Sequence, residues 1–330
     1  MAKKRVAING FGRIGRLTFR NLLENKNIEV VAINDLTDNA TLAHLLKYDS
    51  AHGAFDQKVT STDTHIKVGR KNILAMSERD PSKLPWKKNK IDIVLECTGF
   101  FRTKDTAGMH LKAGAKKVIV SAPAKSSGVK TIVMGVNDNQ IKKTDKLLSN
   151  ASCTTNCLAP LMKVVLENWG LVQGSMTTIH GYTGDQRLQD APHNDLRRAR
   201  AAAVNLIPTS TGAADAVTKV LDGVEGKLFA MAIRVPVITG SLVELNVIVE
   251  KDVTVEKINK VFKKYSRGAL KGVLQYVEDP IVSSDIVRSK YSSIFDSELT
   301  KVSGKMIKLV SWYDNEAGYS AKLAELTSRV

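Results

Sequence analysis

The stretch AINGFGRIG, residues 7–15, carries three glycines in the spacing G-x-G-x-x-G. It lies between an apolar run at 5–8, typical of a short buried strand, and an amphipathic stretch at 13–25, typical of a helix. Glycine permits a tight turn and the close approach of a pyrophosphate, whose charge is attracted by the free N–H groups at the start of a helix. The three positions are Gly10, Gly12 and Gly15. This stretch predicts the first strand, turn and helix of a dinucleotide-binding fold.

Asp35 follows Gly15 by twenty residues, at the end of a second apolar run (28–33) that we expect to form a strand. A carboxylate in that place can bind the ribose hydroxyls of the adenosine half of a dinucleotide, and it would repel a 2′-phosphate. Three glycines alone could form an ordinary strand–helix turn. Together with the strand, the helix and the acid in register, they predict binding of NAD rather than NADP.

Short apolar runs and helical stretches alternate up to about residue 150. The further runs lie at 91–99, 116–123 and 131–136, and a second helical stretch lies at 103–115. Strands that are apolar on both faces are typical of a parallel sheet covered by helices. Their alternation with helices predicts a Rossmann-type, doubly wound parallel sheet in an α/β domain at 1–150.

The pattern changes after residue 150. Runs at 241–250 and 305–314 alternate apolar with polar residues, which is typical of an antiparallel sheet exposed on one face. Helices are expected from Cys153 to Asn168, at 254–268 and at 317–328. These elements predict an α+β catalytic domain with a mainly antiparallel sheet at 151–316. A C-terminal helix, at 317–330, is expected to pack back on the first domain.

The composition excludes several classes of protein. No apolar run approaches the ~20 residues that span a bilayer, and the basic start lacks the long apolar segment of a secretory signal. Three cysteines are too few for a disulfide scaffold and fit a reducing cytoplasm. The net charge of +16 comes from Lys and Arg doublets spread along the chain rather than from one basic arm. We therefore expect a cytoplasmic protein that binds small anions, without a membrane or nucleic-acid partner.

The segment SNASCTTNCLAP (149–160) holds two of the three cysteines, four positions apart. Cys153 lies at the expected start of a helix, behind Ser152 as a plausible N-cap. A thiol at a helix N-terminus or beside a protonated imidazole is expected to have a lowered pKa. Cys157 lies one turn further along and is expected to be buried as a small apolar side chain, as is Cys97 at the end of its strand.

His180 follows SMTTI, an expected strand, and opens a polar loop. It could be a base that pairs with Cys153 or an ordinary structural histidine. Zinc needs four ligands, or three and a water. The six histidines show no paired spacing, so no metal site is expected.

Six segments between residues 8 and 320 resemble the phosphorylating glyceraldehyde-3-phosphate dehydrogenases, in the order and at the spacing of that family. They are INGFGRIGR (8–16), SNASCTTNCLAP (149–160), HGYTGDQR (180–187), RRARAAAVNLIPTSTGAA (197–214), RVP (234–236) and SWYDNEAGYS (311–320). The resemblance implies NAD-dependent oxidation of glyceraldehyde 3-phosphate, with inorganic phosphate, to 1,3-bisphosphoglycerate in glycolysis or gluconeogenesis. It implies a thioester on Cys153 as the intermediate and His180 as the base.

The resemblance also implies roles for other positions. The substrate phosphate would be bound by Thr183 and Arg234. The attacking phosphate would be bound or flanked by Ser152, Thr154, Arg198, Thr211 and Gly212. Contacts to the cofactor are implied for Arg13, Ile14, Arg79, Ser121 and Asn315, in addition to the glycine loop and Asp35. The segment 181–205 resembles a loop that packs near the cofactor of a neighbouring subunit, which implies a homotetramer.

Three places depart from the common pattern of the family. Gly181 stands where serine is frequent, and the stretch VITGS (237–241) after RVP is unusual. Ala191 replaces a leucine that helps to exclude NADP, so Asp35 is left as the main residue that selects the cofactor. Two alternatives stay open: erythrose-4-phosphate dehydrogenase, a sister enzyme that releases an acid by hydrolysis, and a nucleic-acid- or surface-binding protein with the charge of +16.

Overall fold

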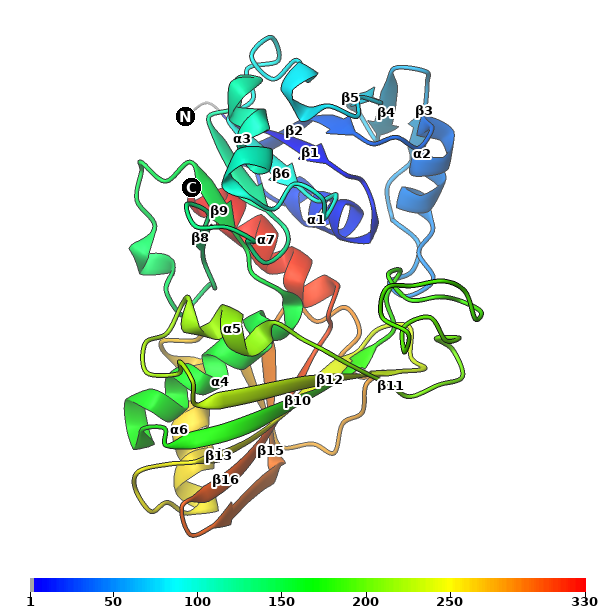
Figure 1. The fold of residues 1–330 in the computed structure, drawn as a ribbon. Coiled ribbons are helices and arrows are strands. Elements are labelled where there is room, and N and C mark those ends of the chain that lie inside the picture. Colours follow the sequence, from blue (N-terminus) through cyan, green and yellow to red (C-terminus); the bar gives the residue numbers. More distant parts are fainter. Residues whose placement is uncertain (1–2) are drawn as a thin grey trace. The chain divides into compact units, whose positions relative to one another are not determined.

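The computed structural model describes residues 3–330 and divides the chain into two compact units. The first unit comprises the chain up to residue 132 together with 140–151 and 320–330, and the second comprises 133–139 and 152–319. Each unit has its own sheet and its own buried core (Figure 1). Among the described residues, no helix is long and apolar enough to cross a membrane.

The sheet of the first unit has nine strands in the order β3-β4-β5-β2-β1-β6-β7-β9-β8. All neighbours are parallel except β3–β4 and β4–β5, which are antiparallel. The strands are β1 (Lys4–Asn9), β2 (Ile28–Asn34), β3 (Val59–Ser61), β4 (His65–Val68), β5 (Lys71–Met76), β6 (Ile93–Glu96), β7 (Lys117–Val120), β8 (Lys130–Thr131) and β9 (Leu147–Ser149). The prediction of a doubly wound, mostly parallel sheet is confirmed.

Two helices of the first unit, the first and the third below, pack on its parallel strands, and the second packs on β3 and β4. In chain order, these helices are α1 (Arg13–Leu23), α2 (Asn39–Lys47) and α3 (Lys104–Lys112), with a short 3₁₀ turn, η1 (Pro81–Lys83). Ala7, Ala32 and Val94 belong to a core cluster that contains Ala107 of α3. Because side chains alternate along a strand, Ile8 lies on the opposite face, where its Cγ2 is 3.4 Å from the position of a Cβ built on Gly15 in α1. The two faces of the sheet are thus covered by different helices.

The prediction of a strand at 131–136 is wrong beyond its first residue. β8 ends at Thr131, and the chain then enters turns up to η2 (Asp138–Gln140). The reason is local: the backbone N–H of Val133 donates to Oδ1 of Asn137 (2.9 Å) instead of a neighbouring strand. The strand that pairs with β7 at this end of the sheet is β9, which the sequence analysis did not identify.

The sheet of the second unit has seven strands in the order β11-β12-β10-β13-β16-β15-β14. β10–β12 and β14–β15 are parallel, and the other neighbours are antiparallel, so the mainly antiparallel sheet is confirmed. The strands are β10 (Gln173–Gly181), β11 (Ile207–Thr209), β12 (Leu228–Val235), β13 (Ser241–Ile248), β14 (Leu274–Val277), β15 (Ser293–Ser303) and β16 (Met306–Tyr313). Along β13, buried residues alternate with partly exposed ones, as the sequence pattern predicted.

Two long helices, α4 (Cys153–Trp169) and α6 (Val255–Arg267), pack on the sheet of the second unit and touch each other (Figure 1). A shorter helix, α5 (Ala213–Thr218), packs against α4. The last helix, α7 (Ala317–Arg329), starts in the second unit and belongs to the first from Ser320 onwards. α4 starts at Cys153 because Ser152 caps it: Thr155 N–H donates to Ser152 Oγ at 3.0 Å. The reactive end of this helix is therefore fixed by its own sequence.

Candidate active site

The glycine loop of the first unit is closely packed at Gly10 and Gly15 and open at Gly12. A Cβ built on Gly15 would lie 2.3 Å from the carbonyl oxygen of Gly10, and one on Gly10 would lie 2.6 Å from the backbone nitrogen of Thr98. Gly12, by contrast, has no atom within 4 Å of its Cβ position, so the loop opens outward there. Close packing on one side and open space on the other fit a pyrophosphate at the start of α1.

Asp35 closes the same loop from the end of β2. Its Oδ2 accepts a hydrogen bond from Phe11 N–H (2.7 Å) and its Oδ1 accepts one from Thr37 N–H (3.0 Å). A cavity of about 410 Å³ lies beside it, lined by Gly10, Gly12, Asp35, Arg79, Cys97 and Phe100 among others. The two hydrogen bonds therefore hold the carboxylate of Asp35 at the edge of the cavity.

The other positions implied for cofactor binding lie around this loop or apart from it. Arg79 lines the cavity. Arg13, at the first turn of α1, donates from NH1 to Asp49 (2.8 Å), and Ile14 follows it on the half-buried side of the helix. Ser121 follows β7 and donates its N–H to the carbonyl of Glu96 (2.9 Å). The expectation that Cys97 is buried is wrong: it is only partly buried and lines the cavity, although removal from water raises the pKa of its thiol to about 12.

Cys153 and His180 meet in the second unit. Cys153 is the first residue of α4, and His180 is the penultimate residue of β10, 3% exposed. Sγ of Cys153 and Nε2 of His180 are 3.4 Å apart, within the range for a sulfur hydrogen bond. The ring of Tyr313 packs edge-on against the imidazole, with centroids 5.9 Å apart. The residues form a thiol–imidazole pair at a helix start.

Two groups compete for the other ring nitrogen of His180. Nδ1 lies 2.6 Å from the carbonyl oxygen of Gly181 and 2.6 Å from NH1 of Arg234. A protonated Nδ1 donates to the carbonyl, which leaves a lone pair on Nε2 facing the thiol. An unprotonated Nδ1 accepts from the arginine, which places the proton on Nε2. Both tautomers have a partner, so the imidazole can take up a proton from the sulfur side and give it back.

Burial controls the ionisation of this pair. It raises the pKa of the Cys153 thiol, against the opposing effects of the Arg234 cation and of hydrogen bonds from Thr154. Burial and the same arginine lower the pKa of His180 to about 3. The expectation of a lowered thiol pKa at the helix start is therefore wrong: removal from water outweighs the favourable N–H groups of the first turn.

Cys157 is the buried companion that the sequence predicted. Its Sγ lies 3.7 Å from Ser293 Oγ and 3.7 Å from the carbonyl oxygen of Ser311, and burial raises the pKa of its thiol to about 12. Both contacts are weak hydrogen bonds inside the packed sheet. Cys157 is thus a core residue, and Cys153 is the thiol that meets a base.

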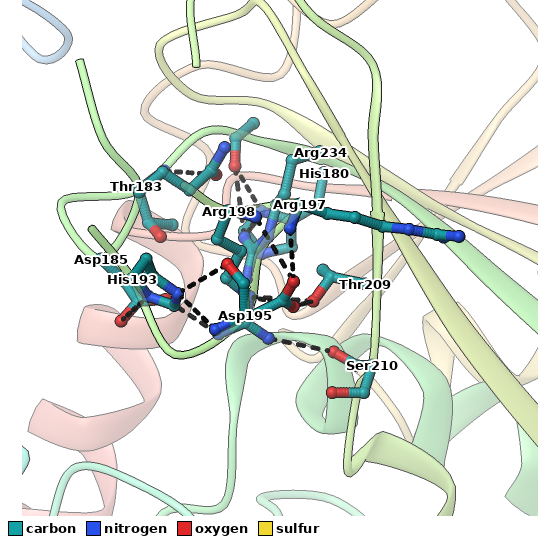
Figure 2. Close-up of polar contacts among 12 residues, drawn as sticks. His180, Thr183, Asp185, His193, Asp195, Arg197, Arg198, Thr209, Ser210 and Arg234 are labelled. Atoms are coloured by element: carbon teal, nitrogen blue, oxygen red, sulfur yellow. Dashed lines mark hydrogen bonds and ion pairs between the residues drawn. The ribbon is translucent and has the colours of Figure 1, made fainter. Parts of the chain in front are cut away.

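Arg234 lies beside His180, and Thr183 lies in the loop that follows β10; Figure 2 labels all three residues. NH1 of Arg234 contacts His180 and the carbonyl of Gly181 (3.3 Å), whereas its buried Nε has no hydrogen-bond partner. Thr183 N–H donates to Oε1 of Gln186 at 3.2 Å, which leaves the hydroxyl outside that bond. A half-buried guanidinium with an unpartnered donor is suited to an anionic ligand, because phosphate accepts paired N–H bonds.

Arg198, by contrast, is already paired. Its NH1 donates to Asp185 (2.8 Å) and its Nε donates to Thr209 Oγ1 (2.8 Å), with Asp195 at 3.3 Å (Figure 2). The two carboxylates balance its charge and hold the fork in place. The sequence analysis did not identify these partners, because both come from the irregular segment 182–206, where no periodicity marks a contact.

The remaining positions of the implied phosphate site lie at two helix starts. Thr154 is in the first turn of α4, with its Oγ1 2.9 Å from the hydroxyl of Tyr313. Thr211 Oγ1 accepts from Ala213 N–H (3.3 Å), and Gly212 is the N-cap of α5. The Tyr313 hydroxyl, a group that the sequence analysis missed, also lies 2.7 Å from Thr178 Oγ1. The tyrosine therefore fixes the side of α4 that carries Thr154.

Asn315 is buried at the end of β16, apart from the glycine loop in the sequence. Its side-chain oxygen accepts from Gly240 N–H and Ser241 Oγ. It belongs to the second unit, with Cys153 and His180. No group of three or more potential metal ligands occurs in residues 3–330.

Comparison with known proteins gives a consistent result over the whole chain. The family model of the NAD-binding domain of glyceraldehyde 3-phosphate dehydrogenase matches residues 4–104, and that of its C-terminal domain matches 152–315. The glyceraldehyde-3-phosphate dehydrogenase of Geobacillus stearothermophilus is 55% identical over 328 residues, which cover 99% of this chain and 98% of that protein. The proteins of the same name from Mycoplasma pneumoniae and Thermotoga maritima are each 56% identical, over 98% and 97% of this chain and 96% and 97% of their own lengths. The chain belongs to the glyceraldehyde-3-phosphate dehydrogenase family of NAD-dependent oxidoreductases.

Proposed function

We propose that the Cys153–His180 pair carries out the reaction of this family, the oxidation of glyceraldehyde 3-phosphate with inorganic phosphate. The observation that supports this most directly is the 3.4 Å separation of Sγ and Nε2 at the start of α4. A buried imidazole with a low pKa is neutral at pH 7 and can accept a proton from the thiol as the sulfur attacks.

The chemistry splits into two steps on the same sulfur. NAD, when bound, supplies the acceptor for the hydride that the aldehyde carbon loses. Cys153 adds to that carbon through Sγ, and His180 passes the proton taken from the thiol to the carbonyl oxygen, which becomes a hydroxyl. His180 takes this proton back as the carbon loses its hydride and is oxidised to a thioester. The N–H groups of the first turn of α4 stabilise the negative charge that develops on the oxygen. Inorganic phosphate then attacks the thioester, the carbon–sulfur bond breaks, and the Cys153 thiolate leaves.

Two phosphate sites serve these steps. Arg234 and Thr183 bind the phosphate of the substrate, supported by the unpartnered Nε of Arg234. The attacking phosphate is held by Arg198 with four residues at or before the starts of α4 and α5, namely Ser152, Thr154, Thr211 and Gly212. Because Asp185 and Asp195 already hold Arg198, that second phosphate has to share its guanidinium with two carboxylates, which favours exchange over tight retention.

NAD binds through the first unit. The glycine loop (Gly10, Gly12 and Gly15, with Arg13 and Ile14) receives the pyrophosphate and Asp35 receives the adenosine ribose, supported by the open side of Gly12 and by the cavity beside the loop. Arg79 lies on the adenine side and Ser121 in the middle of the cofactor. Asn315, from the second unit, receives the nicotinamide amide.

A homotetramer is the form in which we expect the chain to work. Apolar side chains of the second unit are unusually exposed: Leu188, Leu196, Val204 and Phe229 are 81%, 80%, 76% and 74% exposed. Three of these side chains lie in the segment 188–204 and the fourth lies in β12. Exposed large apolar side chains are typical of a surface that another subunit covers. We place the protein in the cytoplasm and expect no nucleic-acid partner, since the basic doublets form no continuous arm.

The functional boundary lies near residue 150. An NAD-binding domain at 1–150, a catalytic domain at 151–316 and a returning helix at 317–330 are supported by two compact units, of which the first holds most of the chain before residue 152 and the second holds 152–319 together with 133–139. The assignment of 320–330 to the first unit supports the return of the helix.

The direct test follows the absorbance of NADH with glyceraldehyde 3-phosphate, with and without inorganic phosphate. Rapid steady turnover that requires phosphate, or arsenate in its place, supports the phosphorylating reaction. Equal rates in phosphate-free buffer would refute it in favour of hydrolysis of the thioester, the reaction of the erythrose-4-phosphate enzyme. The curated relatives, all named for glyceraldehyde 3-phosphate, do not favour that alternative.

A further inference from the structure

The side-chain amide of Asn315 is held in one orientation. Its Oδ1 lies 3.1 Å from the backbone nitrogen of Gly240 and 2.8 Å from Ser241 Oγ. A backbone N–H can only donate, so the atom that faces Gly240 has to be the oxygen. The two donors fill both lone pairs of this oxygen, and the amide nitrogen necessarily points the other way.

The proton of Ser241 is assigned by its neighbour. The backbone N–H of Gly181 donates to Ser241 Oγ at 3.1 Å, so the serine oxygen is an acceptor there and its single proton is directed to Asn315. Thr239 does not compete, because its hydroxyl is closer to Asp314 Oδ1 (3.0 Å) than to the Asn315 oxygen (3.4 Å). Ser241 is therefore the side-chain donor to Asn315.

The nitrogen of the same amide has no partner. Asn315 is 4% exposed, and Nδ2 makes no hydrogen bond to any of the described residues 3–330. This nitrogen is not one of the buried side-chain atoms without a partner, so it keeps accessible surface. These donors are available to a ligand.

Ser241 also connects this amide to the thiol–imidazole pair. Gly181 gives its N–H to Ser241 and its carbonyl oxygen lies 2.6 Å from Nδ1 of His180, whose other nitrogen faces Cys153. In the tautomer with a protonated Nδ1, hydrogen bonds and the backbone of Gly181 thus link the reactive sulfur to Asn315, within one unit of the structure.

Two departures from the common family pattern meet in this series. A Cβ built on Gly181 would lie 3.1 Å from the carbonyl oxygen of Val237 and 3.2 Å from Cα of Thr239. The segment VITGS therefore occupies space beside residue 181 that a larger side chain would need. Glycine at 181 lets the 237–241 turn approach closely enough for Ser241 to reach both Gly181 and Asn315.

We propose that Ser241 is a positioning residue that aims the Asn315 amide nitrogen at the carbonyl oxygen of the nicotinamide carboxamide. This rests on the proposed role of Asn315 toward NAD. Holding that carboxamide fixes which face of the ring is turned toward the substrate carbon. The bond series then keeps the donor in a constant place relative to the thiol.

The test compares NAD with ADP-ribose, which lacks the nicotinamide, in calorimetric titrations of the full-length protein. In Ser241→Ala the amide loses one of its two anchoring bonds, and we expect the Kd for NAD to rise about three- to tenfold, the effect of one hydrogen bond. The Kd for ADP-ribose is expected to change less than about twofold, because the amide does not contact it. Ser293→Ala is the matched control: it removes a buried serine hydroxyl from β15 in the same sheet, and it should change neither affinity.

Asn315→Asp separates failure of the proposal from failure of the proposed function. The carboxylate still accepts from Gly240 and Ser241 but presents no donor, so binding of NAD should weaken at least as much as in Ser241→Ala, with ADP-ribose unchanged. If Asn315→Asp binds NAD normally, the role of Asn315 is wrong. If Asn315→Asp weakens NAD binding but Ser241→Ala does not, or if Ser241→Ala weakens NAD and ADP-ribose equally, the positioning role of Ser241 is wrong.

Discussion

Replacing Arg234 with leucine should impair the enzyme in two separable ways. The guanidinium uses NH1 on His180 and Gly181, and its Nε is buried without a partner. The edge formed by Nε and NH2 can therefore give a phosphate two charge-assisted hydrogen bonds, each worth about 1.5–3 kcal/mol. Loss of even one lowers kcat/KM for glyceraldehyde 3-phosphate at least about tenfold.

The same substitution should also make Cys153 less reactive. The imidazole of His180 lies between the two groups, with 3.4 Å on the sulfur side and 2.6 Å on the arginine side. A full charge within about 8 Å contributes about 2 kcal/mol at an effective dielectric constant of about 20, or about thirtyfold in the thiolate population. Alkylation of Cys153 by iodoacetamide at pH 7 should slow accordingly.

Steady-state kinetics with two substrates separate these effects. Unphosphorylated glyceraldehyde reports only the loss of thiolate, and glyceraldehyde 3-phosphate reports that loss together with the phosphate contact. Arg234→Lys is the matched variant: its cation should restore alkylation, while its single ammonium should recover only part of the phosphate contact. An equal fractional loss for both substrates in Arg234→Leu would refute the phosphate role, and unchanged alkylation would refute the electrostatic coupling.

Three further predictions concern the neighbouring residues. Cys153→Ser should abolish NADH formation, whereas Cys157→Ser should mainly lower the free energy of unfolding; iodoacetamide labelling of Cys157 ahead of Cys153, read by peptide mass, would contradict this. The unfolded chain binds a proton at a histidine near pH 6.5 and the folded chain binds it at His180 only near pH 3, so His180 should cost stability as the pH falls from 6.5 towards 3. In urea titrations His180→Gln should flatten this decline, and an identical slope in both proteins would show that His180 is not its source. Asp35→Gly should reduce the preference for NAD over NADP in kcat/KM, because the carboxylate that would repel a 2′-phosphate is removed; a wild-type protein that uses both cofactors equally would rule out this role of Asp35.

The elements that the sequence identified are those with a local cause. The helix from Cys153 was predicted because Ser152 is a good N-cap, and the Asp35 strand because its run is apolar throughout. β3–β5 and α2 were missed because these elements are short and carry many polar residues. β15 was missed because buried Asp296 and Ser297 interrupt its apolar pattern.

The same distinction applies to the site. A pairing of Cys153 with His180 was one of two interpretations of the sequence, because one residue begins a helix and the other ends a strand. It could not reveal that Asp185 and Asp195 hold Arg198, or that Ser241 joins Gly181 to Asn315, since these pairs form where irregular loops cross the ends of strands. Irregular loops show no periodic pattern of apolar residues, so their side-chain contacts become visible only in the folded structure.

The prediction of a lowered pKa for the Cys153 thiol was wrong, and the reason shows why the charge of Arg234 is important in this site. A helix N-terminus favours a negative charge by about 0.3–1 kcal/mol at an exposed position, whereas removing a charge from water costs several kcal/mol. At Cys153 the second effect is larger, which is why burial raises the pKa of the thiol. The Arg234 cation is the strongest of the influences that oppose burial there. The guanidinium offered to the substrate phosphate is therefore also the charge on which formation of the nucleophile depends, so a substitution that removes the charge at Arg234 should weaken phosphate binding and lower the reactivity of Cys153 together, whereas Arg234→Lys should preserve the reactivity.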